Sequence, residues 1–408
     1  MTSRTINPKK NSRIDAVLTH EVWGLPIFLG VLWMMFQATF VLGQLPMNWI
    51  DEGVHVLNYW LKLSLNEGWL KSLLTDGIVS GVGAVLVFLP NILILFTFIS
   101  FMEDTGYMAR VAVIMDKLMH FIGLHGKSFV PLIMGFGCNV PAIMATRIIE
   151  NRRDRLLTML IIPFMSCSAR LPVYVLIAGA FFPNNAGSVI FCIYIFGILM
   201  SMLTAIVLSK TVFKNQVDDS PIELTPYRYP SLRLMWRTIR TNSGEYLKKI
   251  SGVVLVASII VWGLCYFPHH PEASPKEQLE KSYLGTIGHV IEPVIKPIGF
   301  DWRMGVAAVA GISAKELIVS TMSILYFDED ISENGKALTT RFAEDDQLQP
   351  LNAIAFLIFV LLYFPCVAVF ITIKNQSGRW RYAIFMALYT TALAWVLAFA
   401  VFQIGGLL

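Results

Sequence analysis

The stretch that decides the fold reads IGLHGK at residues 122–127, followed by an apolar run to GFGCNVP at 135–141. A second stretch, IGFDWR at 298–303, is followed by a run to GISAKE at 311–316. The two stretches lie 176 residues apart, and isoleucine, glycine, a large apolar residue, a cation and a later glycine fall in register. We therefore predict an internal repeat built on interrupted hydrophobic segments, a pattern typical of membrane transporters.

Composition places the chain among membrane proteins. Of its 408 residues, 55% are hydrophobic and 15% are charged, and the mean hydropathy is +0.62. In soluble proteins about a quarter of all residues are charged. We predict an all-α polytopic membrane protein with about seven spans, each long enough to cross a hydrocarbon core of about 30 Å. The predicted spans are residues 22–45, 81–102, 156–182, 187–209, 250–267, 351–373 and 382–407.

Two further apolar segments, 128–146 and 303–326, contain glycine, proline and charged residues, so we expect them to be broken or re-entrant. Basic clusters predict that the amino terminus and the connection after residue 210 are cytoplasmic. The acidic loop 327–350 and the carboxyl terminus are then external. With this topology one broken segment enters from the cytoplasm and the other from outside. The two repeats are therefore expected to be inverted.

Three of the five cysteines stand beside a helix breaker inside a membrane segment. They are Cys138 before Asn139 and Pro141, Cys167 before Arg170 and Pro172, and Cys366 after Pro365. Proline removes a backbone donor and opens the helix, so that carbonyls and the thiol can face a shared interior. A thiol with nearby oxygens suits a borderline or soft metal ion. The alternative is that these cysteines are ordinary buried hydrophobes, as we expect of Cys192 and Cys265.

Charged residues inside the membrane form a second class of candidates. Arg170, Lys315 and Glu316 fall in broken segments, and Glu103 ends a span. An ionisable group at that depth usually pairs with another group or lines a water-filled path. We expect Glu316 to contact a cation, and Arg170 and Lys315 to hold carboxylates or carbonyls. The alternatives are a structural salt bridge and, for Glu103, a solvated position at the interface.

Nucleotide binding is not predicted. Gly126-Lys127-Ser128 resembles the end of a phosphate-binding P-loop, but Phe121 occupies the place of the first glycine and no strand pattern precedes it. We expect this chain to bind neither nucleotide nor nucleic acid, and to have no enzymatic activity of its own.

Longer motifs resemble a known family. GFGCNVPAIMATR at 135–147, ENRRDR at 150–155 and SCSARLPVY at 166–174 are similar to the membrane (gate) domain of bacterial ferrous iron transport protein B, the FeoB family. FMEDTGYMAR at 101–110 and YFPC at 363–366 fit the same pattern. The similarity covers nearly the whole chain from about Ile14 onward.

The resemblance implies that the chain transports Fe(II), as its substrate, across the bacterial cytoplasmic (inner) membrane through two gate regions. It places three cysteines at positions proposed for iron handling. The expected metal ligands are Cys138, Cys167, Cys366, Asn139 and Glu316. The expected structural residues of the gates are Gly135, Gly137, Pro141, Arg170, Pro172, Lys315, Pro365 and Glu103.

Members of this family usually carry an amino-terminal G-protein domain, whose motifs this chain lacks. We therefore expect any coupled GTPase to reside on another chain or a missing domain. Other expected partners are membrane lipids, a small accessory protein on the cytoplasmic face and a second copy of the chain. The G-domain protein is expected to dock around Arg152, Arg153, Arg233 and Arg237. A nucleoside or other small-solute carrier and a non-transporting membrane scaffold remain alternatives; a purine site would favour aromatic and amide groups over thiols.

The predicted domain organisation has five parts. Within the basic connection at 210–249, apolar residues alternate with arginines between Leu232 and Arg240, which predicts a basic amphipathic helix on the membrane surface. The parts are a cytoplasmic amino-terminal segment (1–20), a first span with an external connection (21–77), a first gate repeat (78–209), a basic cytoplasmic connection (210–249) and a second gate repeat (250–408).

Overall fold

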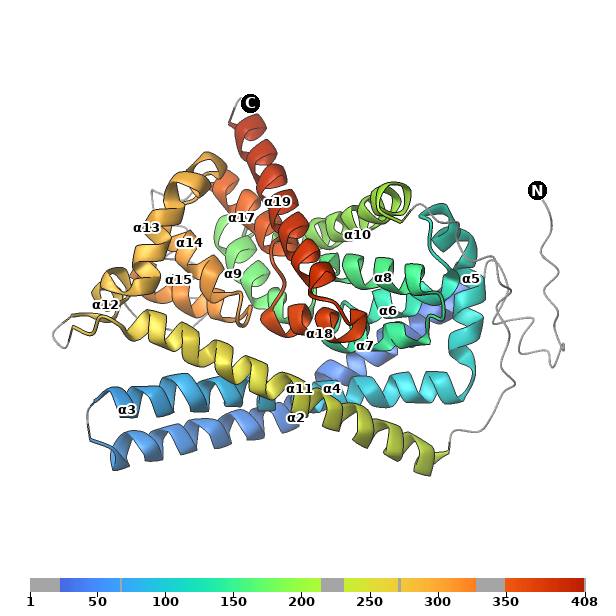
Figure 1. Ribbon diagram of the computed structural model, residues 1–408, viewed down its shortest axis with the longest axis horizontal. Coiled ribbons are helices and arrows are strands. Elements are labelled where there is room, and N and C mark those ends of the chain that lie inside the picture. The colour runs from blue at the N-terminus through green and yellow to red at the C-terminus, as the bar shows by residue number, and fades with distance from the viewer. Residues whose placement is uncertain (1–22, 67, 214–230, 271–272, 328–348, 407–408) are drawn as a thin grey trace. The chain divides into compact units, whose positions relative to one another are not determined.

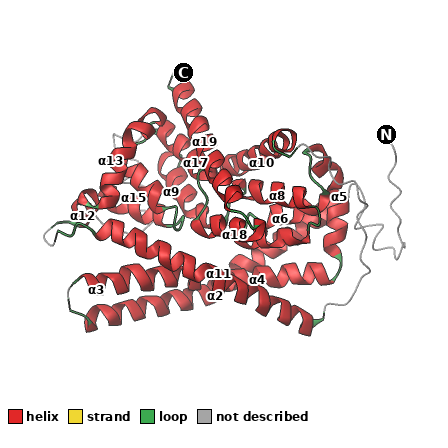
Figure 2. Cartoon of the chain, in the orientation of Figure 1, coloured by secondary structure: helices red, strands yellow, loops and turns green. Residues whose placement is uncertain are grey.

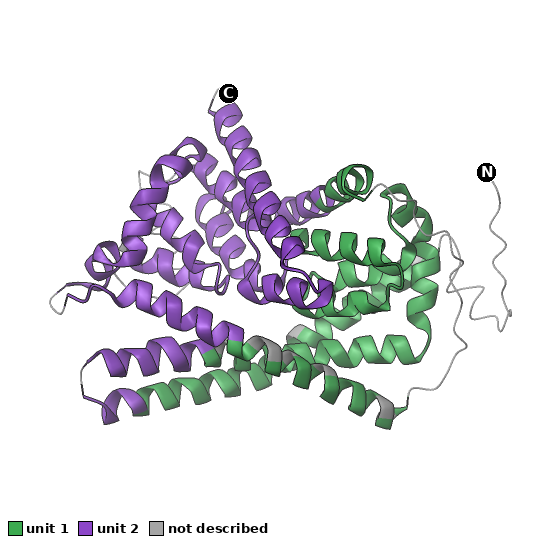
Figure 3. Ribbon diagram, viewed as in Figure 1, with its two compact units in different colours: residues 1–60, 82–165, 201–252 green, residues 61–81, 166–200, 253–408 purple. Residues whose placement is uncertain are grey.

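The computed structural model describes residues 23–66, 68–213, 231–270, 273–327 and 349–406 (Figure 1). Every regular element within these ranges is a helix (Figure 2). The chain divides into two compact units (Figure 3). Unit 1 holds residues 1–60, 82–165 and 201–252, and unit 2 holds residues 61–81, 166–200 and 253–408. The predicted amino-terminal segment, residues 214–230 of the predicted basic connection and most of the predicted acidic loop lie outside the described residues.

Six helical stretches in the described part of the chain are long and apolar enough to cross a membrane. They confirm the predicted all-α polytopic fold. The predicted crossing at 250–267 corresponds to a shorter apolar stretch, Ser251–Tyr266. The six are Pro26–Ser64, Trp69–Asp104, Arg152–Phe181, Ala186–Thr211, Pro350–Ser377 and Trp380–Gly405.

The first helix, α2 (Gly24–Ser64), continues well past residue 45, where the sequence predicts that the first span ends. Pro46 lies inside this helix. A proline removes one backbone donor, which a helix tolerates when neighbouring groups adjust. A short helix α3 (Trp69–Ser72) and a π-helical turn η1 (Leu73–Val79) then lead into α4 (Ser80–Asp104). The connection predicted after the first span is therefore mostly helical.

One helix, α11 (Leu232–Tyr266), contains both the predicted surface helix and the predicted span that follows it. Its 35 residues extend over about 52 Å at 1.5 Å per residue, which exceeds a hydrocarbon core of about 30 Å. The predicted surface helix and the predicted span thus form one continuous helix in the structure.

The backbone repeats itself at the offset found in the sequence. Helix α5 (Tyr107–Phe121) begins 176 residues before α13 (Tyr283–Ile295). After each helix comes a glycine with positive φ, Gly123 at +81° and Gly299 at +80°. The described structure thus duplicates the turn as well as the sequence that forms it.

The match continues into the interrupted segments. The His125 side chain accepts a hydrogen bond from Lys127 N, and the Asp301 side chain accepts one from Met304 N. These caps start the helical segments that end as α6 (Phe129–Met134) and α14 (Trp302–Ala310), again 176 residues apart. Both helices stop at a glycine, and both are followed by irregular backbone.

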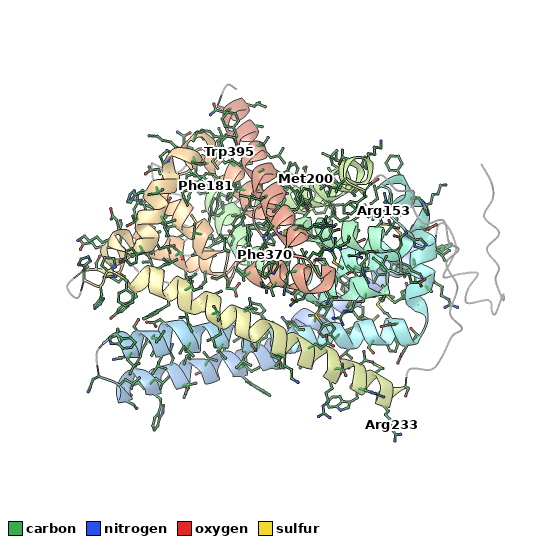
Figure 4. The ribbon with its side chains drawn as sticks, viewed as in Figure 1. Arg153, Phe181, Met200, Arg233, Phe370 and Trp395 are labelled. Atoms are coloured by element: carbon green, nitrogen blue, oxygen red, sulfur yellow. The ribbon has the colours of Figure 1, made fainter. Side chains whose placement is uncertain are left out.

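The helices beyond the interruptions complete the two units. Helix α17 (Pro350–Leu362) forms the centre of unit 2, because residues on all of its sides are buried and it packs on α9 (Leu171–Phe181) and α19 (Trp380–Gly405). Trp395 of α19 (Figure 4) donates a hydrogen bond to the Val294 carbonyl at 2.9 Å. The remaining helices are α7 (Asn139–Ala145), α8 (Arg152–Ile161), α9 (Leu171–Phe181), α10 (Ala186–Thr211), α12 (Pro275–Lys281), α15 (Leu317–Phe327), α17 (Pro350–Leu362), α18 (Val367–Ser377) and α19 (Trp380–Gly405).

Candidate metal sites at the helix breaks

Three cysteines occupy the same kind of position in the structure. Cys138 directly precedes α7, Cys167 precedes a 3-10 turn (Ser168–Arg170) that runs into α9, and Cys366 precedes α18. All three have extended backbone conformations and are half-buried. Each thiol therefore stands where a helix begins, beside backbone N–H groups that lack intrahelical partners.

In unit 1, glycine makes the first break possible. A Cβ atom on Gly135 would lie 2.8 Å from the Cβ of Met165, so that a side chain here would force the chain apart. Cys138 N still donates to the Met134 carbonyl at 3.2 Å, which keeps the turn tight. Pro141 lies in the first turn of α7, where its missing N–H would have had no helical partner. Gly137 lies inside the same turn.

Asn139 is the first residue of α7 and is 3% exposed. Its Oδ1 atom is buried and has no hydrogen-bond partner among the described residues. Leaving a buried acceptor unsatisfied costs about 1–3 kcal/mol. The amide oxygen next to Cys138 is therefore available to a cation, which is the role that the sequence predicts for it.

In unit 2, three hydrogen bonds join α14 and the break that follows it to the break between α17 and α18. They tie segments that lie about fifty residues apart in the sequence. The bonds run from Lys315 Nζ to the Phe364 carbonyl (2.7 Å), from Val367 N to the Ile312 carbonyl (2.9 Å) and from Tyr363 Oη to the Ala308 carbonyl (3.2 Å).

Lys315 lies at the centre of this junction and is 3% exposed. Its Nζ lies 3.4 Å from the centroid of the Tyr363 ring, close enough for a cation–π interaction. The side chain is also in electrostatic range of Arg170, Cys366 and Cys167. The ammonium thus meets the broken end of α17, where backbone carbonyls lack helical donors.

Arg170 is a second buried cation in the same unit, with 1% exposure. It interacts electrostatically with Tyr174 and Tyr363. The Ser166 hydroxyl donates to the Tyr174 hydroxyl oxygen at 3.0 Å, which connects this group to the residue before Cys167. Pro172 and Pro365 stand next to the two breaks, at the start of α9 and just before Cys366.

The expected metal ligands fall into two groups. Cys366 is in electrostatic range of Cys167 and Glu316, and all three belong to unit 2. Cys138 and Asn139 belong to unit 1. Across the residues that the structure describes, no three His, Cys, Asp or Glu side chains are grouped so that they could hold a metal ion. Each unit thus holds part of the set of ligands that the sequence predicts.

Two of the predicted residues lie in surroundings that differ from those of a buried site residue and an exposed docking residue. Glu103 is exposed in the last turn of α4. Arg153 (labelled in Figure 4), which we expected on a docking surface, is directed inward and its side chain is only 9% exposed. It donates to the carbonyls of Gly123 (2.9 Å) and Phe213 (3.1 Å) and to Asp154. A guanidinium with these acceptors is used within unit 1, so Arg153 is a poor docking residue.

Sequence reasoning missed the Tyr363 ring and the Phe364 carbonyl as partners of Lys315. The available signal was Pro365, which follows them directly and marks a place where the helical hydrogen bonds fail. The partner itself comes from a segment 49 residues away, which no local pattern identifies.

The fold and the breaks together define a class: a polytopic helical membrane protein with duplicated, interrupted segments, of the kind used in transport. The sequence profile of the Gate family, described as nucleoside recognition, matches residues 85–181 and again residues 247–380. The profile described as the C terminus of ferrous iron transport protein B matches residues 190–240. Two matches to one profile agree with the internal repeat.

Each of three curated relatives has FeoB in its name. An "Fe(2+) transporter FeoB" of Campylobacter jejuni is 43% identical over 100% of this chain and 68% of the relative, and one of Staphylococcus aureus (strain MSSA476) is 41% identical over 97% and 59%. A Porphyromonas gingivalis "Fe(2+) transport protein A/Fe(2+) transporter FeoB fusion protein" is 46% identical over 96% of this chain. The chain therefore belongs to the FeoB family. It spans 51% of the fusion protein's length. No solved structure matches it.

Proposed function

We propose that this chain carries Fe(II) across the bacterial cytoplasmic membrane, with Cys138, Cys167 and Cys366 as thiol ligands along the path. The observation that carries the proposal is their common position, each directly before a helix at a break. The names of the relatives support iron as the cargo. Fe(II) accepts sulfur and oxygen ligands together, which the breaks can offer.

Oxygen ligands complete the proposed path. Asn139 Oδ1 is buried and has no partner among the described residues, and Glu316 lies in electrostatic range of Cys366. Backbone carbonyls at the breaks supply further oxygens. Because the described side chains do not form a three-residue metal site, each stop on the path binds the ion weakly. Weak binding suits transit, since a transported ion must leave as readily as it enters.

The gates are the two interrupted repeats, in the predicted regions 78–209 and 250–408. Gly135, Gly137 and the prolines at the breaks provide irregular backbone that lines a path. Arg170 and Lys315 hold the broken ends in unit 2. Inverted repeats that move in alternation would open the path to one side at a time.

Uptake of radioactive Fe(II) by cells that lack other iron transport tests this proposal. At equal membrane abundance, Cys138→Ser and Cys167→Ser should each lower uptake about tenfold or more, with Cys366→Ser milder, because hydroxyl is a poor ligand in place of thiolate. Cys192→Ser and Cys265→Ser are matched controls. Full uptake by the triple mutant would refute the thiol path. Uptake of labelled nucleoside instead of iron would favour the nucleoside carrier, and uptake of neither would favour a scaffold.

We further propose that energy coupling depends on a G domain that lies on another chain or in a missing domain, with a small accessory protein also acting at the cytoplasmic face. The P-loop-like turn is occupied by internal contacts, since Gly126 N donates to Asp116 and Lys127 Nζ donates to Glu150, both at 2.9 Å. Calorimetry with the purified chain should therefore detect no GTP binding. Iron flux into liposomes, with and without added G-domain protein, measures the dependence on the partner.

A further inference from the structure

A buried lysine in unit 2 touches groups that suit a metal cation. Lys315 Nζ lies 2.7 Å from the Phe364 carbonyl oxygen and 3.4 Å from the Tyr363 ring centroid. Main-chain carbonyl oxygens line ion paths in channels, and aromatic faces attract cations. The ammonium thus contacts two groups that favour positive charge.

The break in the helix explains why this carbonyl is open to an ion. Helix α17 ends at Leu362 and α18 begins at Val367, so Phe364 lies between them. Pro365 follows and carries no N–H. Val367 N donates to Ile312 of the other break. The Phe364 carbonyl therefore points at Lys315 instead of serving a helix.

The junction also adjoins a thiol that the proposed path uses, because Cys366 stands two residues after Phe364 and directly before α18. Electrostatic interactions link Lys315 to this thiol, to Cys167 and to the buried cation Arg170. A divalent ion held by these two thiols would therefore enter a space already occupied by positive charge. Like charges repel strongly where little water screens them. The ammonium and a metal ion therefore cannot both occupy the position beside the Phe364 carbonyl and the Tyr363 ring.

We propose that Lys315 is a tethered counter-cation, which occupies the iron position of unit 2 when no ion is bound and is displaced from the Phe364 carbonyl and the Tyr363 ring when Fe(II) binds. This inference rests on the proposed function. Lysine is suited to the role, because its charge is compact and its four-carbon stem is flexible. When no ion is bound, the ammonium donates to the Phe364 carbonyl and holds the α17–α18 break against the segment that carries Lys315. As the ammonium returns, it weakens the hold on the ion and promotes release.

A structural cap is the competing explanation. In that case Lys315 only satisfies the broken end of α17, and removing it loosens the junction and weakens any metal site nearby. The two explanations predict opposite changes in metal affinity. A neutral side chain that still donates to the carbonyl separates the effect of the charge from that of the hydrogen bond.

The test is a titration of the purified full chain with Co(II), whose thiolate charge-transfer absorbance reports sulfur ligation. Lys315→Met and Lys315→Gln should each bind Co(II) about tenfold more tightly than the original chain, because both remove the competing charge. Gln keeps a donor for the Phe364 carbonyl, so it preserves the junction if Met does not. Release of Co(II) to a chelator should be slower in both variants by a similar factor.

Lys374→Met is the matched control. Lys374 also lies over an aromatic ring in unit 2, with Nζ 5.0 Å from the Trp380 centroid, but outside the junction. It should leave the affinity unchanged. Weaker or unchanged binding in Lys315→Gln would overturn the counter-cation role and leave the thiol site standing. Because Cys138 in unit 1 can also ligate Co(II), the part of the band that depends on Cys167 and Cys366 is the readout. No thiolate band in any variant, or a band that is undiminished when both Cys167 and Cys366 are serine, would overturn the thiol site in unit 2 and the role of Lys315 with it.

Discussion

Gly123 and Gly299 hold the same left-handed conformation, with φ of +81° and +80°, at equivalent positions of the two repeats. Each follows a helix and closes it with matching hydrogen bonds, from Leu124 N to Met119 and from Phe300 N to Ile295. The two glycines mark the point where an ordinary helix gives way to an interrupted segment. The turn therefore fixes the direction in which each interrupted segment leaves its helix.

Replacing either glycine with alanine should destabilise the protein by about 2–3 kcal/mol, because positive φ is strained for alanine and the added carbon meets a neighbour. At Gly123 the neighbour is the Ser209 side chain, and at Gly299 it is the Phe402 ring. Gly378→Ala is the control: its φ is +73° but the space is open, so only the backbone cost of about 1 kcal/mol applies. Thermal unfolding in detergent measures all three. Equal losses at the three positions would show that the close contacts do not matter.

Asn139→Leu should raise the unfolding free energy by about 1 kcal/mol, since it removes a buried acceptor that lacks a partner in the described structure. The same change should lower iron uptake about tenfold if the amide oxygen is a ligand. Ser128→Ala is the matched control in unit 1, because its buried Oγ also lacks a partner among the described residues. It should stabilise without loss of uptake. An Asn139→Leu variant with unchanged uptake would remove Asn139 from the path.

The Arg153–Asp154 ion pair should be strongly coupled. Arg153 Nη1 lies 2.6 Å from Asp154 Oδ1, and the Asp154 side chain is fully buried. Arg153→Met should destabilise unit 1 by about 3–5 kcal/mol, because a buried carboxylate loses its ion pair. The double variant with Asp154→Leu should recover part of that loss. Purely additive losses in the double-mutant cycle would contradict the coupling.

Topology can be tested by labelling single introduced cysteines in intact cells with an impermeant thiol reagent. Glu280→Cys on α12 should react, and Asn375→Cys near the end of α18 should not, because the basic residues around 374–381 predict the cytoplasmic side. Both positions are exposed. Asp330→Cys and Asp345→Cys, which lie outside the described residues, should react like Glu280→Cys. The reverse pattern would overturn the predicted inversion.

The sequence alone predicts those features that local chemistry controls. The 176-residue offset and the three breaks beside cysteines depend on glycine and proline residues close to each break. The passage of α2 through Pro46 is different, because a proline both permits and breaks helices, and the surroundings decide. The unbroken course of α11 past residue 250 was missed because the change from basic to apolar composition suggests a boundary that the backbone does not make.

Contacts between distant segments lie beyond such reasoning. The Lys315–carbonyl contact and the inward course of Arg153 depend on segments brought together by tertiary packing. From composition, Arg153 looks like one more cation in a basic cluster. Its partners Gly123 and Phe213 lie 30 and 60 residues away. The sequence therefore names the right cation-bearing segments without revealing which cations face inward.

Because α11 is one continuous helix, it also fixes the angle between the side chains that make contacts along it. Within unit 2, Trp262 donates to the Ser72 hydroxyl at 2.8 Å, and four residues earlier the Ser258 side chain lies 2.5 Å from where a Cβ atom on Gly81 would stand. Inserting one residue between them would rotate one contact against the other by about 100° and shift it by about 1.5 Å. Only an insertion close to whole turns would restore the phase. The number of residues between these two contacts of α11 is therefore fixed by the rotation of the helix. Chains with this helix should vary in length elsewhere.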